Sequence, residues 1–155
     1  MPAWLPDANQ RGVVFHVLQT QAPRFRLQHL IRLLEALWAA GRQCDLRLPS
    51  EQAVHTLDRQ LWQYRADAFL PHALGSEAPE TPIRLWADAS PQQGDILINL
   101  HPQLPEHFKG FKLTLELLDQ SPELIERGRE RYRTFKKAHA VTPEVLKLTE
   151  EMLNP

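Results

Sequence analysis

The segment 123–139 concentrates positive charge in a chain whose net charge is only −1. At about 100° per residue of an α-helix, one group of its cations falls together beside an apolar stripe. Because guanidinium groups bind carboxylates in bidentate pairs, such a flank suits an acidic peptide, one side chain of which would enter an adjacent apolar hollow. The cations are Arg129, Arg133, Lys136 and Lys137, and the stripe is Ile125, Gly128, Tyr132 and Phe135, with Gly128 leaving room for the hollow.

The same pattern has a purely structural interpretation. A surface helix of a globular protein also carries an apolar stripe that packs on the core and a charged face that stays in solvent. The spacing alone favours this simpler hypothesis over a peptide-binding site.

A second group of candidate binding residues lies around the connector that follows Trp62. Leu61 and Trp62 are followed by the run Phe69-Leu70-Pro71-His72. Aromatic side chains on loops often anchor protein interfaces, although they also commonly close the lid of a core. Both interpretations stay open on the sequence alone.

Patterns typical of catalysis or of cofactor binding are missing from the sequence. The six glycines form neither a dinucleotide-binding fingerprint nor a phosphate loop. The seven histidines lack the H-x-x-x-H spacing of a metal site, and the serines lack a nucleophile elbow. We therefore expect no cofactor, no metal and no catalytic residues.

The predicted elements that must position these groups alternate between strands and helices. Strands are expected at 12–18, 44–48, 83–86, 95–100 and 111–117, the last covered on one face only. Helices are expected from 25 to 38, after an N-cap at Ser50, from an N-cap at Ser121, and across 142–153. This order predicts one α/β domain over 1–155, a three-layer sandwich with a mostly parallel, Rossmann-like sheet of about five strands and no nucleotide-binding loop.

Composition narrows the classes of partner and the cellular compartment. The near-neutral charge gives no general field for duplex DNA or an anionic membrane. The lone Cys44 cannot form an internal disulfide, and neither a signal peptide nor a spanning run of about 20 apolar residues is visible. We expect a cytoplasmic protein without membrane contact.

Four motifs, taken in order, resemble the DNA polymerase III chi subunit family. They are Leu57-Asp58-x-x-Leu61-Trp62, Phe69-x-Pro71-His72, Asp95-Ile96-Leu97-Ile98-x-Leu100 and Arg129-Glu130-Arg131-Tyr132-Arg133. Each motif is weak alone, but the ordered set extends from about Leu57 to Phe135, over most of the chain.

The resemblance implies a non-catalytic adaptor of the bacterial clamp loader that bridges two proteins. One partner is the psi subunit, at the positions matched by Trp62, Phe69 and Pro71. The other is single-stranded DNA-binding protein, whose acidic C-terminal tail ends in a Pro-Phe carboxylate. The tail site matches Leu118, Arg129, Tyr132 and Arg133, so DNA would be contacted only indirectly.

Two positions depart from the family pattern. Arg133 stands where the family has a lysine, which keeps the charge, whereas Ile125 stands where it has a basic residue. Arg127 or Lys136 are candidates for the missing cation. The segment 142–155 is also longer and more helical in pattern than the family implies.

Two rival functions remain at this point. A small nucleotide-binding α/β enzyme is disfavoured by the missing phosphate loop. Direct binding of single-stranded nucleic acid is disfavoured by the neutral charge and by the scarcity of aromatic pairs on which bases could stack.

Overall fold

A single open sheet, all of whose strand pairs are parallel, organises the chain in the computed structural model, which describes residues 2–64, 70–89 and 91–153. Within these residues seven strands lie in the order β3-β4-β2-β5-β6-β1-β7. In chain order they are β1 (Gly12–Leu18), β2 (Cys44–Leu48), β3 (His72–Leu74), β4 (Ile83–Ala87), β5 (Gly94–Asn99), β6 (Phe111–Leu118) and β7 (Glu144–Leu148). The α/β class is confirmed, with more strands than the expected five or so.

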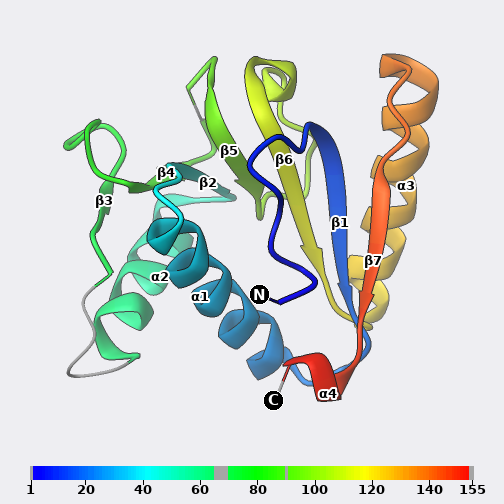
Figure 1. Ribbon diagram of the computed structural model, residues 1–155, viewed down its shortest axis with the longest axis horizontal. Coiled ribbons are helices and arrows are strands. Elements are labelled where there is room, and N and C mark those ends of the chain that lie inside the picture. The colour runs from blue at the N-terminus through cyan, green and yellow to red at the C-terminus, as the bar shows by residue number, and fades with distance from the viewer. Residues whose placement is uncertain (1, 65–69, 90, 154–155) are drawn as a thin grey trace.

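Helices cover both faces of the sheet and make three layers (Figure 1). The helices α1 (Pro23–Ala39) and α2 (Glu51–Gln63) pack on one face, where their leucines join the larger apolar cluster. The helix α3 (Pro122–His139) packs on the other face over β1 and β6, beside the one-turn 3₁₀ helix η1 (Phe108–Gly110). None of the described helices combines the length and apolar character needed to cross a membrane.

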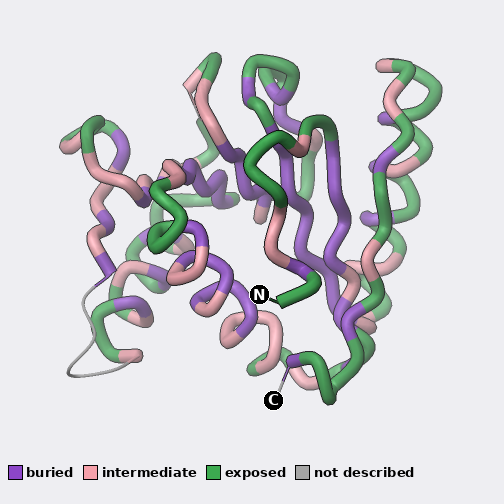
Figure 2. The backbone as a smooth tube through the Cα atoms, viewed as in Figure 1, coloured by how far each residue is buried: buried purple, intermediate pink, exposed green. Residues whose placement is uncertain are grey.

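The central strands consist mostly of buried residues, as Figure 2 shows, and their side chains join apolar clusters on both faces of the sheet. In β1, Val14 and Leu18 face α1, whereas Val13 and Phe15 face α3. The expectation that β6 would be covered on one face only is wrong. Its side chains from 113 to 118 are all buried, because α3 and η1 cover the second face.

The helix ends follow local chemistry in α2 and depart from it in α3. Ser50 is the N-cap of α2 as expected, and its Oγ accepts a hydrogen bond of 3.1 Å from the Ala53 amide. Ser121 does not cap α3 with its side chain. Its Oγ instead donates to the Asp119 carboxylate, which also accepts from the Ser121 amide at 2.9 Å.

The helix expected across 142–153 is wrong. Residues Glu144–Leu148 form the strand β7, which pairs with β1, and only the single-turn helix α4 (Glu150–Leu153) follows. Leu146 and Leu148 alternate into the apolar cluster under α1. The spacing of Val145 and Leu148 suits a helix equally well, but β1 offers an unpaired edge that a strand satisfies.

Candidate partner-binding site on α3

Close approach of α3 to the sheet fixes the position of the candidate site. A Cβ atom on Gly128 would come within 2.3 Å of Leu118 Cδ1, so a larger residue there would force the Leu118 side chain to move. Further along the helix, Phe135 is fully buried, and its ring meets Phe15 and Phe108 edge to face. The space over Gly128 is therefore filled by Leu118, which corrects the expectation of an open hollow there.

A buried polar network holds the same helix from its inward side. Arg131 is only 6% exposed, and its Nε lies 2.7 Å from Oε2 of the fully buried Glu116. The Arg131 Nη1 donates to the Pro102 carbonyl oxygen at 2.7 Å, while Asn99 Nδ2 donates to Glu116 at 3.3 Å. Burial raises the pKa of Glu116 to about 7, against the opposing effects of Arg131 and Asn99. Of the three arginines in the motif 129–133, Arg131 is thus structural.

The remaining arginines of the motif lie on the outer flank of α3. Arg129 and Arg133 are exposed, and the neighbouring Tyr132 is half-buried. The Tyr132 ring meets Phe15 edge to face at 6.1 Å between centroids, and Lys136 Nζ lies 5.7 Å from the centre of the same ring. The helix therefore presents cations beside an aromatic face, as its spacing predicts.

The four residues assigned to tail binding are only partly brought together. Arg129, Tyr132 and Arg133 share a stretch of α3, and Leu118 lies beneath it at the end of β6, buried against Gly128. Leu118 can thus shape the floor of a site but presents little surface itself. Sequence reasoning missed Val145 and Lys147, which β7 places on the α3 side of the sheet.

The connector residues lie at the opposite edge of the sheet. Trp62 near the end of α2 is 55% exposed, and its ring lies 5.0 Å from that of His72 in β3. His72 is held by the Leu70 carbonyl oxygen at 2.7 Å and by Asp58 at 3.0 Å. Pro71 is half-buried beside this pair, and Phe69 lies outside the described residues. Trp62 and Pro71 therefore flank His72 at one corner of the sheet.

The carboxyl ends of the strands, where nucleotides bind in related α/β folds, carry a cavity of about 690 Å³. Its lining includes Arg26, but also the carboxylates Asp119 and Glu123. The chain turns into α2 there through Pro49 and Ser50, without a glycine-rich loop. Two carboxylates in a glycine-free hollow would repel the phosphates of a nucleotide.

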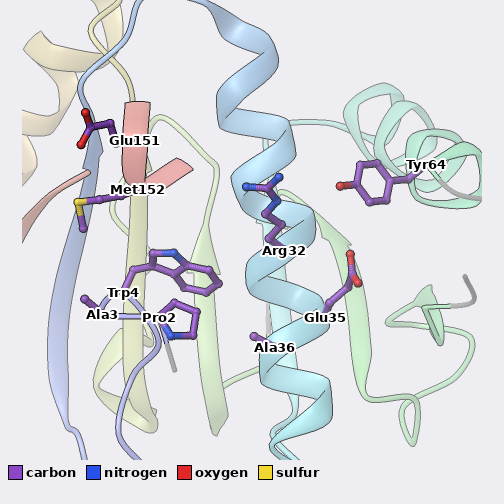
Figure 3. Close-up of a pocket in the computed structure, with 9 residues that line it drawn as sticks. All are labelled: Pro2, Ala3, Trp4, Arg32, Glu35, Ala36, Tyr64, Glu151 and Met152. Atoms are coloured by element: carbon purple, nitrogen blue, oxygen red, sulfur yellow. The ribbon is translucent and has the colours of Figure 1, made fainter. Parts of the chain in front are cut away.

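A larger hollow of about 880 Å³ crosses the outer side of α1 (Figure 3). Trp4 and Met152 lie on one side of the helix, and Tyr64 lies on the other. Arg32, in the middle, donates to the Leu153 carbonyl oxygen and so fixes α4 against α1. This groove is mainly apolar and holds no recognisable set of catalytic groups among the described residues.

Three titratable groups outside these sites are buried in the core. His16 Nδ1 and His29 Nε2 lie 3.0 Å apart in the core, and burial lowers the pKa of His16 to about 4 and that of His29 to about 3. Burial raises the pKa of the Cys44 thiol. Within the described ranges, no cluster of three or more His, Cys, Asp or Glu side chains could hold a metal ion.

Comparison with known proteins adds a family to this geometry. The family model described as DNA polymerase III chi subunit, HolC, matches residues 11–142. A DNA polymerase III subunit chi from Pseudomonas aeruginosa is 33% identical over 126 residues, which cover 81% of this chain and 89% of that protein. The proteins of the same name from Haemophilus influenzae and Escherichia coli are 30% and 28% identical, over 67% and 65% of this chain and 75% and 71% of their own lengths.

Proposed function

Because the chain belongs to the DNA polymerase III chi subunit family, we propose that it is a non-catalytic adaptor that joins the psi subunit of the replicase to single-stranded DNA-binding protein. The proposed mechanism is tethering. One surface binds psi and so connects the chain to the clamp loader, and the other binds the acidic C-terminal tail of single-stranded DNA-binding protein. DNA is then held near the polymerase through that protein, in the cytoplasm.

The outer flank of α3 is the observation that carries the tail-binding proposal. Arg129 and Arg133 are exposed although the neighbouring Arg131 is buried, so two guanidinium groups remain available for carboxylates. Tyr132 lies beside them on the helix, with its ring in contact with that of Phe15. An acidic peptide that ends in an aromatic residue would pair its carboxylates with the arginines and pack its last ring near Tyr132.

The corner at the other edge of the sheet supports the psi-binding proposal. Trp62 exposes more than half of its surface yet is held in place through its contact with His72. Tryptophan side chains are frequent anchors of protein interfaces. We assign Trp62 and Pro71 to this surface, together with Phe69 on the basis of the family resemblance.

A peptide titration tests the tail site. A fluorescently labelled peptide of several aspartates followed by Pro-Phe with a free carboxylate should bind with an affinity that falls as salt increases. Arg129→Ala should weaken it by about 1.5–3 kcal/mol, the value of a charge-assisted hydrogen bond.

Arg127→Ala is the matched control for that titration. Arg127 is also an exposed arginine of α3, but it lies on the flank near Arg26. Burial lowers the pKa of Arg26, and the charge of Arg127 lowers it further. Its removal changes the net charge equally and should leave the affinity nearly unchanged. If Arg129→Ala and Arg127→Ala lose the same peptide affinity, the effect is one of overall charge, and the assignment of the tail site is wrong.

The two rival functions predict different results. A nucleotide-binding enzyme should be stabilised by one of the common nucleotides in a thermal-shift screen. A direct binder of single-stranded nucleic acid should retard a bare oligonucleotide in a gel at physiological salt. We expect neither effect.

A further inference from the structure

The face of β7 that turns toward α3 continues the surface on which the tail site lies. Side chains of paired residues in a sheet point to the same face, so each row of the register can be followed across the strands. One row runs from Leu118 through Val17 to Lys147, and the next row from Glu116 through Phe15 to Val145. Val17 and Phe15 belong to the apolar cluster under α3, so Val145 and Lys147 face the same way.

These two residues are exposed although they lie beside a buried row. Val145 is 44% exposed, which is uncommon for a valine in a strand, and Lys147 is exposed as well. Their neighbours Leu146 and Leu148 point to the other face and join the cluster under α1. The strand β7 is the last of the sheet order within the described residues, so no described strand continues the sheet beyond it.

The level of each residue along α3 follows from the fold. Val145 pairs with Phe15, whose ring contacts Tyr132, so Val145 lies at the level of Tyr132. Lys147 lies about 6.5 Å further along the strand. The helix α3 runs antiparallel to the strands and rises about 1.5 Å per residue. The distance from Val145 to Lys147 therefore corresponds to roughly four residues of α3, counted back from Tyr132, so Lys147 lies at about the level of Arg129.

At this level the helix itself supplies few further cations toward β7. Ile125, one turn before Arg129 on the same flank, is apolar and half-buried. Arg127 lies on the opposite flank, where its charge acts on Arg26, and Lys136 lies over the Tyr132 ring further along the helix. Lys147 is therefore the β7 cation that lies at the level of Arg129, near the middle of the helix.

We propose that β7 forms the second wall of the peptide site, with Lys147 pairing with a carboxylate of the bound acidic tail and Val145 extending the apolar surface around Tyr132. This inference rests on the proposed tail-binding function. The arrangement places positive charge on both sides of an aromatic floor, which suits an extended acidic peptide that ends in a ring. In this arrangement Lys147 supplies the cation that the family has at the position of Ile125, so neither Arg127 nor Lys136 is needed for that role.

The same labelled peptide, titrated against the whole chain, tests the second wall. Lys147→Ala should weaken binding roughly three- to ten-fold at low salt, as expected for one partly exposed ion pair, and Lys147→Arg should restore it. Lys112→Ala is the matched control, because Lys112 is also an exposed strand lysine on the α3 face, but lies six residues before Leu118, about 20 Å along β6. In a nitrogen–proton NMR titration of the unmodified chain, the amides of 145–147 should shift together with those of 129–133.

The possible results separate this inference from the proposed function. If Arg129→Ala abolishes binding while Lys147→Ala behaves like Lys112→Ala and the amides of β7 do not shift, the peptide binds α3 alone and the second wall is wrong. If the peptide fails to bind the unmodified chain, the tail-binding function itself is wrong. If Lys147→Ala lowers the melting temperature, Lys147→Glu in a charge-swap with a lysine-containing peptide distinguishes a lost contact from a damaged fold, since only a direct contact would regain affinity.

Discussion

Replacing Arg131 with methionine is the sharpest test of how α3 is attached to the sheet. The substitution keeps the aliphatic length of the side chain but removes the guanidinium group that pairs with Glu116 at 2.7 Å. Glu116 then stays fully buried, and the amide of Asn99 at 3.3 Å and the charge of Arg26 are the described groups that still favour its ionised form. The perturbation is therefore a buried carboxylate that loses its cation.

The size of the effect depends on pH. Removing one partner of a buried ion pair costs roughly 3–5 kcal/mol. Because burial raises the pKa of Glu116 to about 7, above its ordinary 4.5, the folded state holds a proton that the unfolded chain releases. The stability from that proton is complete below about pH 4.5 and is lost as the pH rises through about 7.

Loss of Arg131 removes the largest influence that lowers this pKa, so in the variant the Glu116 pKa rises further. At pH 5.5 Glu116 is protonated in both proteins, and the variant loses mainly hydrogen bonds, including that to Pro102, at a cost of about 1–2 kcal/mol. At pH 8, about one unit above the Glu116 pKa of the original chain, the penalty should be larger by up to about 1.4 kcal/mol, because the variant keeps a proton that the original chain releases.

Urea unfolding followed by circular dichroism at pH 5.5 and pH 8 measures this difference. Arg129→Met, two residues away and exposed, should cost less than about 0.5 kcal/mol at either pH. In a Glu116→Gln background, Arg131→Met should lose its pH dependence. A penalty for Arg131→Met that is the same at both pH values, or whose pH dependence persists in the Glu116→Gln background, would refute the coupling.

Three further predictions concern stability and reactivity. Trp62→Ala should weaken psi binding in a pull-down yet leave the melting temperature nearly unchanged, whereas Trp4→Ala, at a residue only 7% exposed, should cost about 3–5 kcal/mol of unfolding free energy. Cys44, buried and with a raised pKa, should resist a disulfide reagent at pH 8 until denaturant is added, and rapid native modification would contradict its burial. Burial lowers the pKa of His16 to about 4 and of His29 to about 3, below the ordinary 6.5, so the stability they contribute is present above pH 6.5 and falls on acidification. The slope should reach about 1.4 kcal/mol per pH unit for each, and His29→Gln should flatten it.

Local patterns in the sequence were sufficient for the central elements of the fold. Buried apolar runs predicted β1, β2 and β5, and capping chemistry predicted the start of α2 at Ser50. The edge strands could not be predicted in this way. The strand β3 has only three residues, and β7 exists because β1 offers a partner more than a hundred residues earlier in the chain.

The sequence predicted which residue types form the candidate site, but not which of them are buried. Charge type alone suggests that Arg129, Arg131 and Arg133 are alike, yet Arg131 is buried. Its spacing from Gly128 and Phe135 places it on the apolar stripe, and Glu116 is a charge inside an apolar strand. A stripe arginine and a strand glutamate are the signals from which the buried pair could have been inferred.

The distance between the two proposed surfaces bears on how an adaptor can bind two proteins at once. Trp62 lies at the β3 edge and Lys147 on β7, at opposite ends of the sheet order. Six steps of about 4.8 Å separate these edges by about 29 Å, well beyond the Debye length of about 8 Å at physiological salt. Charge on one partner is therefore screened from the other surface. Because the intervening strands form one packed core, the two binding free energies should be additive, so that Trp62→Ala leaves peptide affinity unchanged. Coupling between them would instead require a change in the sheet itself.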